Sequence, residues 1–217
     1  MNTATREMLE CGAAGFGLQL SFDQVEKLAL YAKELKKWNR KINLTAIKSD
    51  EDIVIKHFVD SLVLAKFVKA DAMLVDIGSG AGFPCIPLKI IMPALRVTSV
   101  DAVEKKIIFQ RNVARLIGLA GFEAVHGRAE QLQPDNKADA VVSRAFSDIL
   151  TFAGMAKGLM KPEGMIIAMK GKEGREEAEH AKGKLEQMGL TVSAVEEFRL
   201  PSIGDARSLV FIRSKTG

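Results

Sequence analysis

Residues 73–83 have the sequence Met-Leu-Val-Asp-Ile-Gly-Ser-Gly-Ala-Gly-Phe, and the organisation of the whole chain follows from them. They begin with a short apolar run that contains one carboxylate near its end, which is typical of a buried parallel strand. Three glycines at every second position follow, and then Pro84, whose fixed φ suits the start of a helix. A strand, a glycine turn and a helix N-terminus together form a cradle in which the backbone can approach a ligand closely.

The spacing of these glycines indicates which ligand the cradle holds. A dinucleotide-binding fold prefers Gly-x-Gly-x-x-Gly. The spacing here is Asp76-x-Gly78-x-Gly80-x-Gly82, which resembles motif I of the class I methyltransferases that use S-adenosylmethionine. A second predicted strand ends in Asp101, where an acid accepts hydrogen bonds from ribose hydroxyls in such folds. A tight turn without a ligand is the alternative, but this order of strand, motif, helix, strand and acid favours a cofactor site.

The composition is that of an ordinary globular protein. The 217 residues, 47% of them apolar and 27% charged, fit one domain plus an extension. Cys11 and Cys85 are isolated and there are only three histidines, so neither a disulfide framework nor a metal site is predicted. No uncharged run is long enough to span a bilayer, and the charges of Arg6, Glu7 and Glu10 are unlike a secretory signal. We therefore expect a cytoplasmic protein with no membrane contact.

Two parts of the chain are predicted, a helical extension over residues 1–70 and one compact cofactor-binding domain over residues 71–217. Glycines interrupt any long helix before residue 20. A capping box at residues 21–24 begins a helix that we expect to end near Asn39, and Ser49 begins another. Strands and helices then alternate, with strands predicted at 73–77, 96–101, 122–126, 138–143, 165–170, 190–199 and 208–213. This alternation predicts an α/β, Rossmann-like sheet of seven mostly parallel strands, the last two forming an antiparallel pair.

Ligands in such sheets lie beyond the carboxyl ends of the strands. Our interpretation places five groups of residues there: the loop from Gly78 to Phe83, Asp101, Ala129 with Glu130, Arg144, and Lys170. From its position alone, Glu130 is equally consistent with a place beside the adenine of a cofactor and with an exposed surface acid. An apolar strand that runs into Ser-Arg-Ala-Phe favours a functional role for Arg144 over simple packing.

Two absent motifs narrow the reaction. Methyltransferases of this fold that modify amino nitrogens carry Asn/Asp-Pro-Pro-Tyr/Phe after the fourth strand, where this chain has Ser143-Arg144-Ala145-Phe146. Pyrimidine C5 enzymes need a cysteine nucleophile, but Cys85 lies at the start of the helix inside the cofactor motif, and we assign it a structural role.

Several segments together resemble the ribosomal RNA small subunit methyltransferase G family, also called GidB. They include Trp38-Asn39-x-x-Ile42-Asn43-Leu44-Thr45, His57-x-x-Asp60-Ser61, residues 76–84, residues 143–145 and the Lys170-Gly171 turn. The match covers nearly the whole chain after residue 20. The resemblance implies methyl transfer from S-adenosylmethionine to guanine N7 in 16S rRNA of the small ribosomal subunit, in a loop near the decoding centre, with S-adenosylhomocysteine as the product.

The resemblance also assigns roles to single residues. It implies that Gly78, Phe83, Ala129, Glu130 and Arg144 contact the cofactor, beside Gly80 and Asp101 from the motif itself. One departure is Ala102, where many members have serine. Arg144 and Lys170 are the candidate catalytic residues, because both can donate to guanine O6.

Basic residues are the candidates for RNA contact. The net charge of +4 is only mildly basic, so clustering matters more than the total. The predicted RNA-binding residues are Arg40, Lys41, His57, Lys172 and Arg207. A solvated surface is the alternative for each cluster, and for Arg207 the two interpretations are equally supported. We expect the protein to act as a monomer.

Two other functions stay open from the sequence. A nicotinamide-dependent oxidoreductase shares the general fold, although the glycine spacing and the missing catalytic Tyr or His motif count against it. A non-catalytic RNA-binding module would keep the fold as a scaffold.

Overall fold

The computed structural model describes residues 1–132, 137–144, 146 and 148–215; Ala145, part of the predicted Ser-Arg-Ala segment, lies outside these residues. Within them, seven strands form one sheet in the order β3-β2-β1-β4-β5-β7-β6. The strands are β1 (Met73–Ile77), β2 (Arg96–Asp101), β3 (Phe122–His126), β4 (Ala138–Ser143), β5 (Met160–Lys170), β6 (Leu190–Arg199) and β7 (Ala206–Ser214). Strands β1 to β5 are parallel, and β7 is antiparallel to both β5 and β6. The predicted sheet and its antiparallel final pair are confirmed.

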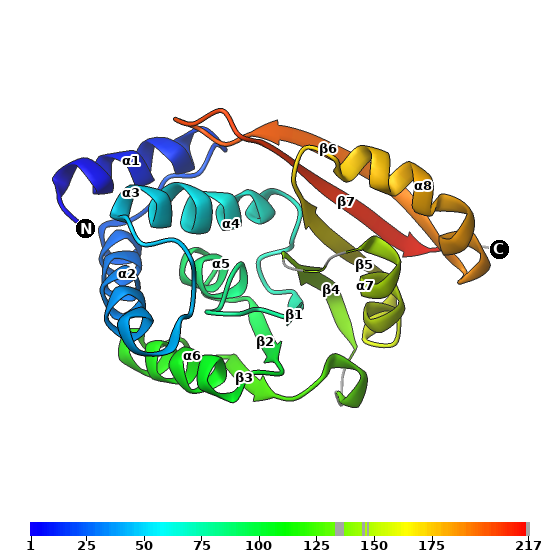
Figure 1. Ribbon diagram of the computed structural model, residues 1–217, viewed down its shortest axis with the longest axis horizontal. Coiled ribbons are helices and arrows are strands. Elements are labelled where there is room, and N and C mark those ends of the chain that lie inside the picture. Colours follow the sequence, from blue (N-terminus) through cyan, green and yellow to red (C-terminus); the bar gives the residue numbers. More distant parts are fainter. Residues whose placement is uncertain (133–136, 145, 147, 216–217) are drawn as a thin grey trace.

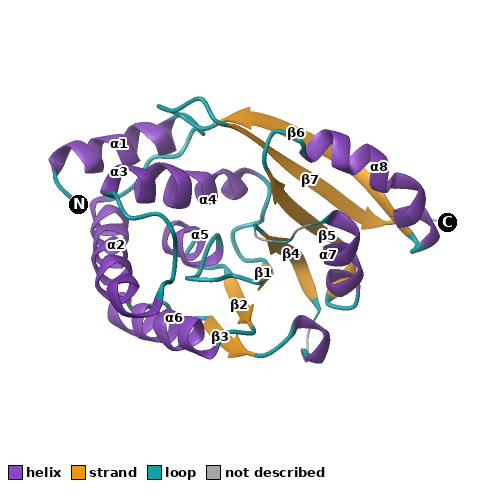
Figure 2. Ribbon diagram, viewed as in Figure 1, coloured by secondary structure: helices purple, strands orange, loops and turns teal. Residues whose placement is uncertain are grey.

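Helices cover both faces of this sheet (Figures 1 and 2). The helical segments are α1 (Thr3–Ala14), α2 (Phe22–Ile42), α3 (Asp50–Asp52), the π-helical η1 (Ile53–Val59), α4 (Asp60–Leu62), η2 (Val63–Lys66), α5 (Cys85–Ile91), α6 (Glu104–Ile117), η3 (Ala129–Gln131), α7 (Ile149–Lys157) and α8 (Gly174–Gln187). Alternate residues of one strand enter different cores: Leu74 packs with the N-terminal helices, α5 and α6, whereas Val75 packs with α7 and α8. The N-terminal helices therefore share a continuous core with one face of the sheet.

Local signals explain where the helices near the site begin and end. The predicted capping box is present at Ser21 and Gln24, and the Ser49 hydroxyl accepts a hydrogen bond from the backbone N–H of Asp52. Helix α2 continues to Ile42, past the predicted end at Asn39, because the left-handed residue that terminates it is Asn43, with φ of 48°.

Two further boundaries differ from the prediction. Residues 3–14 form helix α1 although Gly12 lies within it, and a Cβ on this glycine would be 2.6 Å from Val59 Cγ2. The glycine therefore allows close contact between α1 and η1. Strand β5 begins at Met160 instead of residue 165, because its first residue pairs with Ala138 before an irregularity in the register.

None of the helices in the described residues is both long and apolar enough to cross a bilayer.

Candidate active site

The glycine loop after β1 forms the centre of the site. Gly78 and Gly80 have φ of 68° and 62°, which glycine adopts without strain. The Gly80 N–H donates to Asp101 Oδ2 at 2.8 Å, and the second oxygen of this carboxylate accepts from the Val103 N–H at 2.8 Å. The end of β2 therefore fixes the shape of the loop that follows β1.

A cavity of about 220 Å³ lies beside this loop, and we call it the loop cavity. Its lining residues are Ile77, Gly78, Val100, Asp101, Ala102, Gly127, Arg128, Ala129, Glu130, Phe146 and Met155. A Cβ on Gly80 would meet nothing within 4 Å, so the space above the loop is open to a ligand. Of the predicted cofactor contacts, Gly78, Asp101, Ala129 and Glu130 line this cavity together. A backbone cradle, an acid and an apolar wall fit the requirements of an adenosine group.

Buried polar groups hold the loop from below. Asp76 is fully buried, and its Oδ2 accepts from the Cys85 N–H at 3.1 Å. Burial raises the pKa of Asp76 to about 7, although the hydrogen bonds from Cys85 act in the opposite direction. On the other side, Gln110 Nε2 donates to the Gly80 carbonyl and to Ser79 Oγ, both at 2.8 Å. Cys85 itself is buried, which agrees with a structural role.

Helix α2 supports the same loop from the N-terminal extension. The hydroxyl of Tyr31 donates to the Ala81 carbonyl at 2.6 Å, and its ring stacks on Phe83 with centroids 5.2 Å apart. Phe83 is itself almost completely buried and does not line the loop cavity. The predicted contact between Phe83 and the cofactor therefore stays a prediction, while the structure gives Phe83 a packing role below the loop.

His57 connects the extension to the end of β4. Its ring stacks on Phe83 with centroids 4.2 Å apart and planes 10° from parallel. Nδ1 lies 2.8 Å from Arg144 Nη2, and Nε2 lies 2.9 Å from Thr45 Oγ1. Because an arginine only donates, Nδ1 must accept and Nε2 must carry the hydrogen that is donated to Thr45.

The surroundings of His57 keep its ring neutral. Burial, together with the positive charge of Arg144, lowers the pKa of His57 to about 3. The residue as a whole is only 6% exposed. Both ring nitrogens are engaged by protein groups, Thr45 and Arg144, and the predicted RNA contact of His57 stays a prediction.

Arg144 is held by three further groups. Its Nη1 donates to the Lys56 carbonyl at 2.9 Å and lies 3.5 Å from Asp60 Oδ2, while its Cζ lies 5.1 Å from the centre of the Phe83 ring. Asp60 is 4% exposed and also faces Arg207, whose Nε lies 3.4 Å from Oδ1. Burial raises the pKa of Asp60 above its usual value, although the two arginines act in the opposite direction.

This ion-paired group forms one wall of a cavity of about 290 Å³, which we call the Asp60 cavity. Its lining residues are Ile47, Lys56, Asp60, Arg144, Met169, Lys170, Gly171, Phe198, Arg207, Ser208 and Leu209. Arg144, Lys170 and Arg207 therefore come together at this cavity from β4, β5 and β7. For Arg144 and Lys170, this is the end of the sheet at which the sequence placed them.

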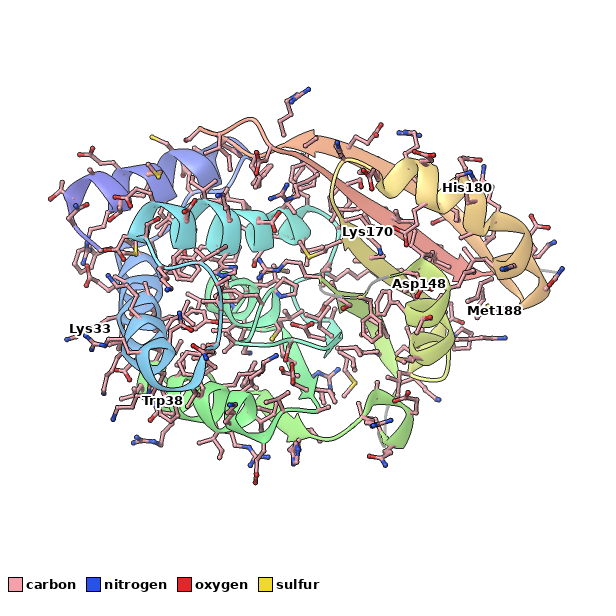
Figure 3. All side chains as sticks on the ribbon, viewed as in Figure 1. Lys33, Trp38, Asp148, Lys170, His180 and Met188 are labelled. Atoms are coloured by element: carbon pink, nitrogen blue, oxygen red, sulfur yellow. The ribbon has the colours of Figure 1, made fainter. Side chains whose placement is uncertain are left out.

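Lys170 lies at the end of β5, between α7 and α8 (Figure 3). Its ammonium donates to the Phe146 carbonyl at 3.1 Å and to Glu177 Oε1 at 2.9 Å. A third cavity, of about 450 Å³, opens beside it, and we call it the Lys170 cavity. Its lining residues are Arg144, Phe146, Met169, Lys170, Gly171, Lys172, Glu173, Gly174 and Glu177. The Phe146 side of this cavity adjoins the loop cavity, because Phe146 lines both.

The remaining predicted residues lie on the surface. Arg40 and Lys41 are exposed in the last turn of α2, and Lys172 is exposed beside the Lys170 cavity. Three residues of the site were not predicted from the sequence: Tyr31, Phe146 and Glu177. Phe146 could have been found, because it lies directly after the fourth predicted strand, whereas the contacts of Tyr31 and Glu177 join residues that are distant in the sequence. No group of histidine, cysteine and acidic side chains suited to a metal occurs in the described part of the chain.

The strand order, the glycine loop after β1 and the acid at the end of β2 define the fold of the class I methyltransferases. Solved structures of low sequence identity share this fold. TYW2 from P. horikoshii in complex with MeSAdo gives a TM-score of 0.61 at 18% identity, covering 74% of this chain and 63% of that chain. TYW2 from M. jannaschii in complex with AdoMet gives 0.56 at 13% identity, covering 91% and 78%.

Sequence comparison identifies the family within this class. The model of the GidB family, described as rRNA small subunit methyltransferase G, matches residues 24–209. A relative named ribosomal RNA small subunit methyltransferase G from Geobacter sulfurreducens is 56% identical over 98% of this chain and 99% of its own length. The relative of the same name from Geotalea uraniireducens is 57% identical over 97% of each chain. The chain belongs to the rRNA small subunit methyltransferase G family.

Proposed function

We propose that this protein transfers a methyl group from S-adenosylmethionine to N7 of a guanine in 16S rRNA of the small ribosomal subunit. The family and the names of its relatives support the substrate and the reaction. The observation that carries the proposal is the position of Phe146, which lines both the loop cavity and the Lys170 cavity. A cofactor in the first and a base in the second would be neighbours.

The residues of the loop cavity fit the cofactor. Gly78 and Gly80 would offer backbone close to it, Asp101 would accept from its ribose, and Ala129 with Glu130 would lie along its adenine. Arg144 lines the Asp60 cavity and the Lys170 cavity instead of the loop cavity, and it would approach the cofactor from the Lys170 cavity. When bound, S-adenosylmethionine supplies an electrophilic methyl group on a sulfonium.

The acceptor chemistry needs no general base. Guanine N7 has a lone pair in the neutral base, so it can attack a methyl group without losing a proton. The protein's work is then to hold the base in line, a contribution that can reach roughly 7–11 kcal/mol in well-oriented cases. Lys170 and Arg144 are the proposed catalytic residues, because they present positive charge where the base oxygen O6 would lie. The target base would leave its stack to enter the cavity, at a cost of a few kcal/mol.

The proposed RNA contacts are divided between the surface and the cavities. Arg40, Lys41 and Lys172 would meet phosphates from the exposed surface, and Arg207 would do so from the wall of the Asp60 cavity. His57 would support RNA binding from beside Arg144, which its Nδ1 contacts. We also propose that the enzyme works as a monomer in the cytoplasm, where small ribosomal subunits occur.

The direct test is methylation of small ribosomal subunits with S-adenosylmethionine labelled in its methyl group, followed by identification of the modified nucleoside. We expect 7-methylguanosine in 16S rRNA, at a rate that does not rise with pH from neutral to mildly alkaline conditions. A rate that climbs tenfold per pH unit, or a methyl group on an exocyclic nitrogen, would contradict the proposed mechanism. Binding of NAD instead of S-adenosylmethionine in calorimetry would favour an oxidoreductase.

A further inference from the structure

An ion pair between Lys170 and Glu177 forms part of the wall of the Lys170 cavity. The ammonium and Glu177 Oε1 are 2.9 Å apart, and the two side chains are 11% and 29% exposed. Lys170 ends β5, and Glu177 lies in the first turn of α8. A cation and a carboxylate therefore stand side by side in a cavity that adjoins the loop cavity through Phe146.

The position of Glu177 is fixed from two sides. Its Oε1 also accepts from the Ile149 N–H at 2.7 Å, at the first residue of α7. A Cβ on Gly174 would overlap Ser208 Oγ and Lys170 Cβ, so the start of α8 lies directly against β5 and β7. One helical turn later, Glu177 is therefore brought over the end of β5. Among the described residues, its second oxygen, Oε2, accepts no hydrogen bond.

We propose that Glu177 recognises the target base as guanine by accepting hydrogen bonds from N1–H and the N2 amino group. This inference rests on the proposed function, and it concerns the choice of base within that reaction. On guanine, the acceptor O6 is adjacent to the donor N1–H, so a cation beside a carboxylate matches the order of the base edge. Enzymes that act on extruded bases commonly recognise this edge by hydrogen bonds.

The same pair opposes adenine. Adenine has an amino group in place of O6 and an unprotonated N1, so its donor would face Lys170 and its acceptor would face Glu177. A site built to hydrogen-bond a substrate group rejects an analogue that lacks the group far more strongly than an apolar pocket rejects a size change. Selection of guanine would therefore follow from the order of two charges along the cavity wall.

The carboxylate also suits the charge change of the reaction. Methyl transfer to N7 breaks the bond from carbon to sulfur, forms the bond from carbon to N7, and moves the positive charge from the sulfonium to the purine ring. A positively charged ring makes N1–H a stronger donor, so a carboxylate at N1 interacts more strongly with the product-like ring than with neutral guanine. Glu177 would thus offset the positive charge of Lys170 and Arg144 as the ring becomes cationic.

The test compares Glu177→Gln with Glu176→Gln. Glu176 is the neighbouring exposed acid in the same turn of α8, and it does not line the cavity. Both variants remove one negative charge, and glutamine at 177 can still accept from the Ile149 N–H. The substrates are small subunits reconstituted from 16S rRNA with guanine or inosine at the methylated position, which is first mapped with the wild-type enzyme. Inosine keeps N7, O6 and N1–H but lacks the N2 amino group.

We expect Glu177→Gln to lower kcat/KM on the guanine substrate by about tenfold or more, the scale of one hydrogen bond to a charged group. Wild type and Glu176→Gln should each lose a similar factor on inosine, whereas Glu177→Gln should lose much less. The inference is overturned if wild type methylates both substrates equally, or if the losses from Glu177→Gln and from inosine simply multiply. Absence of any methyl transfer by wild type would instead refute the proposed function.

Discussion

Arg144 Nη2 lies 2.8 Å from His57 Nδ1, across 87 positions of sequence, and this contact links the N-terminal extension to the active-site end of β4. The link continues outward, because His57 Nε2 donates to Thr45 Oγ1 at 2.9 Å. Asn39 then holds both the N–H and the carbonyl of Thr45, each at 2.9 Å. Arg144, which can only donate, therefore fixes the tautomer of the histidine, and the extension in turn helps to hold Arg144 in position.

Thr45→Val should slow methyl transfer although Thr45 touches neither of the two cavities assigned to cofactor and base. Valine has nearly the same shape but cannot accept from His57 Nε2 or from the Ile47 N–H, which now bonds to Thr45 Oγ1 at 3.1 Å. Leaving a buried donor such as the Nε2–H of His57 unpaired costs about 1–3 kcal/mol. We expect a lower kcat and a lower free energy of unfolding, measured by single-turnover methylation and by urea titration.

Thr45→Ser is the matched control, because serine keeps the hydroxyl acceptor and removes only a methyl group. It should retain most of the activity. Equal rates for the valine and serine variants would show that the hydroxyl does not position Arg144.

His57 should make the folded state sensitive to acid. The pKa of His57 is about 3 in the folded protein, against 6.5 for an ordinary histidine, so the unfolded chain binds a proton that the folded chain excludes. The contribution of neutral His57 to the free energy of unfolding is therefore fully present above pH 6.5, and it is lost as the pH falls toward 3. Within that window this contribution should fall by about 1.4 kcal/mol for each unit by which the pH is lowered.

The measurement is the free energy of unfolding between pH 7 and pH 4 for wild type and His57→Gln. Glutamine does not titrate, and it can accept from Arg144 and donate to Thr45, so this variant should lose less stability as the pH falls. His180→Gln removes an exposed histidine on α8 and should follow the wild-type curve. Parallel curves for wild type and His57→Gln would mean that His57 is not excluded from protonation.

The sequence predicted the fold well because its signals are local. Alternating strands, the glycine spacing after β1 and the acid at Asp101 each depend on neighbouring residues, and the structure has the predicted sheet of seven mostly parallel strands. The burial of His57 could not be predicted, since it depends on Arg144, Thr45 and Phe83 converging from three distant segments. Glu177 was missed for the same reason: its charge is ordinary for the first turn of a helix, and only the docking of α8 on β5 gives it a partner.

Gly12→Ala should destabilise the protein, whereas Gly183→Ala should stabilise it. Both glycines lie within helices, where alanine is intrinsically favoured by up to about 1 kcal/mol. A Cβ on Gly12 would lie 2.6 Å from Val59 Cγ2, but a Cβ on Gly183 would meet nothing within 4 Å. Urea titration of both variants measures the difference. If Gly12→Ala were also stabilising, the contact between α1 and η1 would be looser than the structure indicates.

Gly80→Arg should abolish binding of S-adenosylmethionine while the protein stays folded. A side chain at Gly80 would enter open space beside the loop cavity, the space that the bound cofactor would need. The substitution also strains the backbone, because Gly80 has φ of 62°. Gly118→Arg is the matched control, since Gly118 has φ of 68°, faces open space and ends α6 without lining the loop cavity. Calorimetry should show binding to the Gly118 variant and none to the Gly80 variant. Undiminished binding by a folded Gly80→Arg protein would place the cofactor elsewhere.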